Sequence, residues 1–152
     1  MSSHTVRQIE AAFETLAARV DLEGFAFDED GEATLAFDDV AVVFRIAQQE
    51  GTVLLLAPLG QPAVPSEALF GALLEANFGW AGTGGGTVSR EPGEGPFMLM
   101  RRLSGEGMTA DSLEADIGAF VSAAESLAAH IAASMPDEPE TDFAADPTAI
   151  RI

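Results

Sequence analysis

Five glycines between Gly79 and Gly86 are the first feature that suggests chemistry, because glycine-rich loops hold phosphate groups in nucleotide-binding enzymes. In such loops the glycines follow a strand and precede a helix, whose N-terminus faces the phosphate. Here the apolar pattern places a helix before the glycines and a strand after them. The chain also has no lysine, which a Walker-type loop requires. We therefore interpret the segment as a turn in which Gly79 or Gly82 takes the left-handed conformation that ends a helix.

The other groups capable of chemistry are isolated. The acidic residues of 28–32 resemble a calcium loop in composition, but Gly31 comes too early for an EF-hand, so this segment is expected to be a solvated turn. His4 and His130 have no second histidine or cysteine at ligand spacing, and His130 suits the C-terminal end of a helix. No serine lies in a nucleophile elbow. The sequence therefore predicts no catalytic site, no cofactor and no metal.

Composition narrows the class of partner. The 152 residues carry a formal net charge of −18, from 25 acidic residues and seven arginines, so nucleic acid is excluded as an expected partner. There is no cysteine, no apolar run long enough to span a membrane, and no signal-peptide pattern at the start. We expect a soluble intracellular protein that does not bind membranes.

Hydrophobic periodicity predicts an α+β fold. Apolar residues three and four apart indicate a helix over 5–21, capped by Thr5. Alternating residues then predict a three-stranded antiparallel meander over 32–59. Ser66 caps a second helix that reaches about residue 77, two strands form a hairpin joined at 92–96, and Thr109 opens the last helix. The predicted order is α-β-β-β-α-β-β-α, with an antiparallel twisted sheet flanked by helices.

The last residues differ from the rest of the chain. Residues 1–134 are expected to form one α+β domain. Residues 135–152 have three prolines, many acids and few large apolar side chains. Such a composition does not offset the entropy of ordering, so we predict a disordered tail.

Residues 33–60 and 68–127 together resemble the class I chaperones of bacterial type III secretion, the Tir chaperone or CesT-like family. The resemblance rests on "LLEAN" at the end of the second helix, the glycine turn, the strand with "RR", the element order and the low pI. It implies a homodimer that binds the N-terminal segment of a secreted effector, keeps it extended and competent for secretion, and delivers it to the export apparatus. It implies no cofactor, and it adds the secretion ATPase as a further partner to test.

The second helix carries more large apolar residues than packing on one sheet requires. By analogy with the family, we expect the dimer interface to include Leu69, Phe70, Leu73, Leu74, Phe78, Trp80 and Val88. An ordinary buried helix is the other interpretation.

The strand 97–103 separates its side chains between two faces. Phe97, Leu99 and Leu103 share one face with Arg101, and the methionines share the other with Arg102. Methionine adapts to varied partners, so the set expected to bind an effector is Val43, Leu54, Leu56, Met98, Met100 and Arg102. The competing interpretation is that the methionines fill the core. We expect Arg101 and Arg102, which face opposite ways, to form a surface pair. The other interpretation is that one of them points at a buried acidic partner.

A stand-alone regulatory or small-ligand-binding domain with the same fold is the alternative function. A pocket that encloses polar groups would favour it. An enzymatic interpretation has no set of residues to support it.

Overall fold

The computed structural model describes residues 2–134, and the predicted acidic tail at 135–152 lies outside the described residues. The elements are α1 (Ser2–Arg19), β1 (Glu32–Phe37), β2 (Val40–Ala47), β3 (Thr52–Gly60), α2 (Glu67–Ala76), the 3-10 segment η1 (Phe78–Thr83), β4 (Thr87–Arg90), β5 (Phe97–Ser104) and α3 (Ala110–Ala133). The predicted order of helices and strands is confirmed, and η1 is an addition to it.

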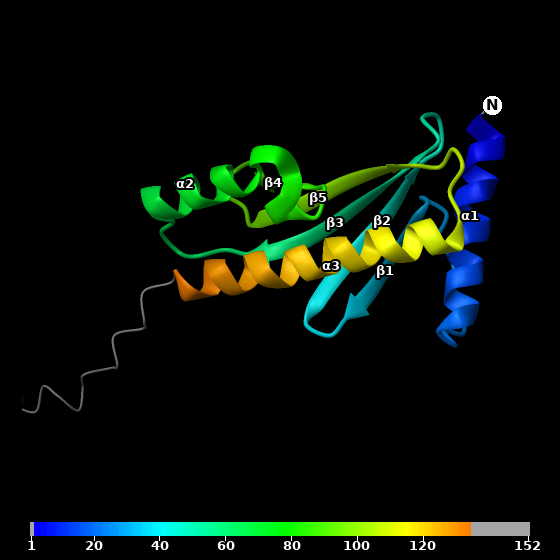
Figure 1. The fold of residues 1–152 in the computed structure, drawn as a ribbon, viewed down its shortest axis with the longest axis horizontal. Helices are drawn as coiled ribbons and strands as arrows, with labels where there is room; N and C mark the ends of the chain where they lie inside the picture. The colour runs from blue at the N-terminus through cyan, green and yellow to red at the C-terminus, as the bar shows by residue number, and fades with distance from the viewer. Residues whose placement is uncertain (1, 135–152) are drawn as a thin grey trace, which may run out of the picture.

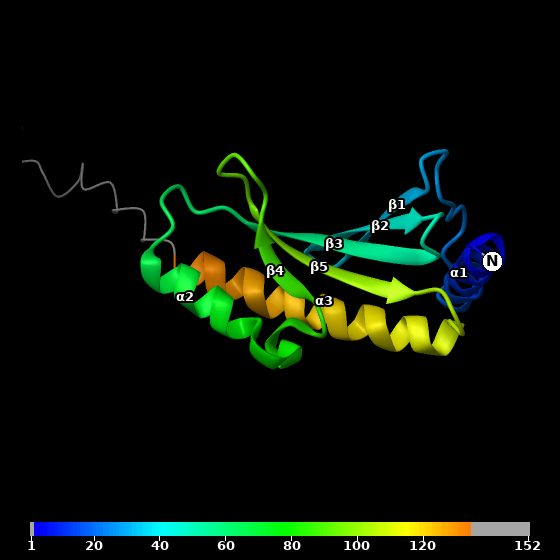
Figure 2. The ribbon, with the colours of Figure 1, turned by 90° about the horizontal axis from the view of Figure 1, so that it is seen from above.

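The five strands form one antiparallel sheet in the order β1-β2-β3-β5-β4 (Figure 1). Helix α3 runs along one face of this sheet, α1 lies at one end and α2 toward the other, while no helix of residues 2–134 covers the opposite face (Figure 2). The helix-covered face supplies the core, because alternate strand residues such as Val42, Phe44, Leu55 and Leu99 are fully buried there.

Two side-chain caps fix the starts of helices as predicted. The hydroxyl of Ser66 accepts a hydrogen bond from the backbone N–H of Leu69 at 3.1 Å. Thr109 and Ser112 form a reciprocal capping box at the start of α3. Each cap satisfies a backbone N–H that the helix itself leaves without a partner.

The predicted cap at Thr5 is wrong, because α1 begins at Ser2 and Thr5 lies inside it. The polar residues before Val6 carry no apolar signal, so periodicity could not place the start. Thr5 instead packs against two backbone turns: a Cβ on Gly51 would lie 3.0 Å from Thr5 and one on Gly105 would lie 2.7 Å away. The contact seats the N-terminal end of α1 on the sheet.

The glycine segment is a turn, as expected, but its left-handed residues differ in part from the prediction. Gly79 has a φ of 71°, whereas Gly82 is not left-handed. Gly84, with a φ of 58°, ends η1, and a Cβ there would lie 2.5 Å from the carbonyl oxygen of Ala119. The glycine is needed because the turn lies directly against α3.

Candidate partner-binding surfaces

The isolated polar groups take the structural roles predicted for them. The Asp28 carboxylate accepts hydrogen bonds from the backbone N–H groups of Asp30 and Glu32, both at 2.9 Å, so the acidic segment is a local turn. His130 is exposed in the last turn of α3. Within residues 2–134 no cluster of three or more His, Asp or Glu residues has the geometry to hold a metal ion.

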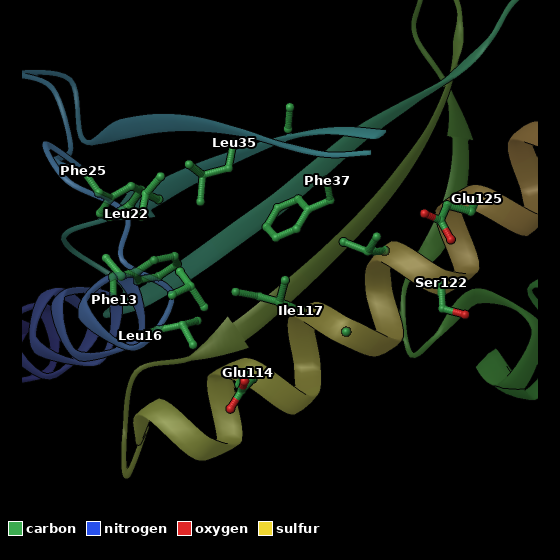
Figure 3. A pocket seen from close by; sticks show the side chains of 15 residues that line it. Phe13, Leu16, Leu22, Phe25, Leu35, Phe37, Glu114, Ile117, Ser122 and Glu125 are labelled. Atoms are coloured by element: carbon green, nitrogen blue, oxygen red, sulfur yellow. The ribbon is translucent and has the colours of Figure 1, made fainter. Parts of the chain in front are cut away.

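Helices α1 and α3 and the edge strand β1 enclose an apolar cavity of about 560 Å³, which we call the β1 pocket. Figure 3 shows Phe13 and Leu16 from α1, Leu35 and Phe37 from β1, and Ile117 from α3 around it. The remaining lining residues are Ala17, Val20, Leu22, Phe25, Ala36, Gly118 and Val121, with Glu114, Ser122 and Glu125 as its polar members.

Two residues that line the β1 pocket, Phe13 and Phe25, belong to a cluster of phenylalanines. The ring of Phe13 lies 5.7 Å from that of Phe25, and 5.0 Å from those of both Phe27 and Phe44. Stacked and edge-on rings at these distances hold one another in fixed positions. The rim is much less covered, since Val20 is 61% exposed. The pocket therefore has an aromatic side backed by the core and an apolar mouth open to solvent.

Charged groups flank the pocket on α3. Arg19 pairs with Asp111 at 2.6 Å and with Glu114 at 3.5 Å, and the hydrogen bond and charge of Asp111 raise the pKa of the Arg19 guanidinium. Glu125, at the other end of the α3 wall in Figure 3, forms no ion pair with any residue from 2 to 134. One carboxylate at the mouth is thus neutralised in part and the other is available.

The two edges of the sheet differ in how their backbone groups are satisfied. At β4, the Asn77 side chain accepts from the N–H of Val88 at 2.8 Å and donates to its carbonyl at 3.3 Å. At β1, the backbone from Ala33 to Phe37 forms hydrogen bonds with β2 but with no other part of the described chain. Thus β1 presents an edge able to accept another strand.

The residues predicted to bind an effector all lie on the face of the sheet that no helix covers. In the register, Val43 on β2 pairs with Leu56 on β3, which pairs with Met100 on β5. Leu54 and Met98 join them, and these five side chains are half-buried, while Arg102 is exposed and pairs with Glu50 at 3.4 Å. The methionines therefore lie outside the core, and their contact with an effector stays a prediction.

The predicted dimer residues divide between two environments. Leu69, Leu73 and Val88 are buried within this chain, and Phe70 is half-buried edge-on to Phe97 with ring centroids 5.8 Å apart. Three large side chains instead face solvent and form what we call the α2 ridge: Leu74 at 71%, Phe78 at 91% and Trp80 at 59% exposure. The dimer interface stays a prediction, and this ridge is the surface available for it.

Trp80 adopts a left-handed backbone conformation, with a φ of 59°. This conformation is costly for a bulky residue. It is held in place because the Trp80 carbonyl accepts hydrogen bonds from the backbone of Gly85 at 3.0 Å and from the hydroxyl of Thr83 at 3.2 Å. The local hydrogen bonds thus fix an exposed aromatic side chain in a strained backbone position.

The two adjacent arginines do not form the surface pair that the sequence predicted. Arg101 points to the helix-covered side, where it donates to Asp116 at 2.8 Å and to the carbonyl of Gly84 at 2.9 Å. An acidic partner for one of the two arginines was the other interpretation, but the sequence did not identify Asp116, because contacts between distant elements leave no local pattern. Arg101 ties the glycine turn to the last helix.

The comparisons with known proteins agree with this geometry. Residues 12–128 match the Tir chaperone protein (CesT) family. The chain belongs to this family. The resemblance to type III secretion chaperones is therefore confirmed, and membership of a chaperone family bears out the prediction that this protein is not an enzyme. No curated protein matches the sequence significantly.

Solved structures of low sequence identity share the fold of this CesT-family chain. A chain of the ExsC–ExsE complex is 22% identical with a TM-score of 0.71, covering 88% of this chain and 97% of that one. A chain of the HopA1–SchA chaperone–effector complex is 12% identical with a TM-score of 0.66, and the match covers 82% of this chain and 96% of that one. A chain from the complex of the Yersinia pestis type III secretion chaperone SycH with a fragment of YscM2 is 15% identical, with a TM-score of 0.62. The match covers 77% of this chain and 97% of that one.

Sequence reasoning missed the β1 pocket. The sequence did contain a signal for it. Val20, Leu22, Phe25 and Phe27 are large apolar residues, and all but Val20 lie between the predicted helix 5–21 and the predicted strands. Residues of this kind outside regular elements either close a core or line a surface. Here they do both, since Phe25 packs on Phe13 and also lines the cavity.

Proposed function

We propose that this chain is a type III secretion chaperone that binds the N-terminal segment of an effector protein, keeps it extended and secretion-competent, and delivers it to the export apparatus. The observation that carries the proposal is the combination of an unpaired β1 edge with an apolar pocket directly beside it. Membership of the CesT family supplies the class of partner.

An extended segment suits this site for two physical reasons. Backbone groups of the segment can hydrogen-bond to the free edge from Ala33 to Phe37, which adds a strand to the sheet whatever the sequence of the segment. Alternate side chains of such a strand point to the helix side, where the β1 pocket would bury them. A segment held in this way cannot fold on itself, which is what secretion competence requires.

The uncovered sheet face is proposed as a second contact for the same partner. Its half-buried apolar residues, among them Leu56 and Met100, form a continuous row across three strands. A segment that leaves β1 and crosses this face would bury them, and a carboxylate of the segment would compete with Glu50 for the exposed Arg102.

We further propose that two copies of the chain associate through the α2 ridge. Three large apolar side chains in solvent are a surface that monomeric proteins seldom expose without a function. A homodimer would present two β1 edges to one partner or to two.

The secretion ATPase is proposed as the protein that receives the loaded complex, and the bacterial cytoplasm as the compartment where loading takes place. No helix within residues 2–134 has the length and apolarity needed to cross a bilayer.

The alternative, a regulatory or small-ligand-binding domain, has less support. A specific small ligand is oriented by polar groups that converge inside its pocket. The β1 pocket has only Glu114, Ser122 and Glu125 as polar lining, and its other lining residues are apolar.

Titration calorimetry tests the proposed function with N-terminal fragments, about 100 residues long, of the proteins encoded beside this chain. We expect at least one fragment to bind with a negative change in heat capacity, because apolar area is buried. Binding should be the same with EDTA and without nucleotide. Val20→Asp should weaken it at the pocket mouth, whereas Val64→Asp, an equal change at a residue 83% exposed elsewhere, should not. A failure of every fragment to bind, or binding that a chelator abolishes, would contradict the proposal.

A further inference from the structure

Gly118 lies in the middle of α3, where glycine weakens a helix relative to alanine. Two reasons usually account for such a glycine, and neither applies. The φ angle of Gly118 is not positive, so its backbone is not left-handed. A Cβ built on it meets no atom of the described chain within 4 Å. The fold of this chain therefore does not need a glycine at this position.

The space that Gly118 leaves open belongs to the β1 pocket. Gly118 lines the pocket beside Ile117 and Val121, so the α3 wall has a notch at this point. Any side chain here would project into the mouth of the pocket. Glycine at a site with no intramolecular contact is explained if something outside the chain approaches the helix closely.

The charge at the mouth indicates what approaches. Glu125 forms no ion pair among residues 2–134, whereas Glu114 is shared with Arg19. The chain as a whole carries a net charge of −18, which attracts positive charge. A segment that brings an arginine or lysine beside Glu125 would gain a charge-assisted hydrogen bond.

We propose that Gly118 and Glu125 set the specificity of the β1 pocket. The occupant is an extended polypeptide segment of the secreted partner, with a large apolar side chain seated in the notch at Gly118 and a nearby basic side chain paired with Glu125. This inference rests on the proposed function and deepens it by naming the chemistry of the bound segment.

The free protein gives the first test. Helix stability favours alanine at position 118, whereas the proposed binding of a partner favours glycine. Gly118→Ala should raise the melting temperature by about 2–5 °C, since alanine is the better helix former and meets nothing. Ser126→Ala, at an exposed α3 position outside the pocket, is the control for helix propensity. A fall in the melting temperature of Gly118→Ala would show an intramolecular role and overturn the proposal.

Binding gives the second test, with the co-encoded N-terminal fragment that the wild-type chain binds most tightly as the probe. Gly118→Met should weaken binding by about tenfold or more, because the notch is filled. Ala115→Met, an exposed α3 position that does not line the pocket, should leave binding unchanged. Equal affinities for the two methionine variants would refute the role of the notch while leaving the chaperone function intact.

Reversal of the charge at Glu125 gives the third test. Glu125→Lys should weaken binding several-fold more than Glu106→Lys, which makes the same change in net charge on an exposed loop away from the pocket. Replacing the basic residue of the probe by glutamate should restore binding to Glu125→Lys. Equal effects of the two lysine variants, or no rescue, would refute the ion pair. If the wild-type chain binds no fragment at all, the proposed function itself fails.

Discussion

Replacing Gly84 by alanine tests whether the glycine-rich segment exists to pack against α3. The residue has a φ of 58°, and the added Cβ would lie 2.5 Å from the carbonyl oxygen of Ala119 and 3.1 Å from the Cβ of Ala123. Gly93, in the turn between β4 and β5, is a matched control, since it is left-handed with a φ of 79° but has no atom within 4 Å of a built Cβ.

The difference between the two variants isolates the steric contact. A left-handed alanine costs about 1–2 kcal/mol at either position. At Gly84 the contact with the helix backbone forces the turn and α3 apart, and overpacking of this kind adds about 1–3 kcal/mol. We therefore expect Gly84→Ala to lose about 2–5 kcal/mol of unfolding free energy and Gly93→Ala about 1–2 kcal/mol.

Urea unfolding of the two variants beside the parent chain, at several protein concentrations, measures both losses. The comparison at several concentrations separates folding from self-association. Equal losses for the two variants would refute the reasoning, because the packing of the turn against α3 would then contribute nothing. No ligand is present in this assay, so a phosphate-binding role for the glycines would not produce the difference.

Three further predictions follow from the surfaces described above. Arg101→Met should cost about 1–3 kcal/mol, because its hydrogen bonds to Asp116 on α3 and to the carbonyl of Gly84 are half-buried. The exposed Arg102→Met should cost less than about 1 kcal/mol by the same urea assay. A chain truncated after Ser134 should keep its unfolding midpoint, and a large decrease would show that residues 135–152 contribute to stability. Light scattering should give the mass of a dimer for the parent chain and for Val64→Gly but of a monomer for Trp80→Gly, since glycine keeps the left-handed backbone and removes the aromatic ring; a monomeric parent would refute the interface.

The fold could be predicted because its signals are local. Strand residues such as Val42, Phe44 and Ile46 recur at every second position of a run of β-branched and aromatic residues, and the side chains of Ser66 and Thr109 mark where helices begin. The approximate element boundaries followed from these patterns alone. An exception was the start of α1, whose first residues are polar.

The surfaces were less predictable because they depend on contacts between distant parts of the chain. Arg101 reaches Asp116 on another element, and the β1 pocket joins four segments of the sequence. The alternation on β5 did place Met98 and Met100 correctly on the face opposite Leu99. Which of the exposed residues meet a partner is a property of two molecules, so no pattern within one sequence determines it.

Trp80 and Gly118 each break a local rule of protein structure without a benefit to the described chain. A tryptophan with a φ of 59° is strained, and a glycine inside α3 with no neighbour weakens the helix. Such exceptions are expected where function, and not folding, selects the residue. They lie on different sides of α3, because the turn that ends η1 packs against Ala119 and Ala123, whereas the β1 pocket is lined by Gly118, Val121 and Glu125. If the two surfaces act independently, Gly118→Met should leave the mass in solution unchanged, and Trp80→Gly should leave the affinity per chain for the partner fragment within about twofold, as expected of separated sites. A larger effect of Trp80→Gly on affinity would show that the partner segment needs both copies of the chain, and the two surfaces would then have to be treated as one site.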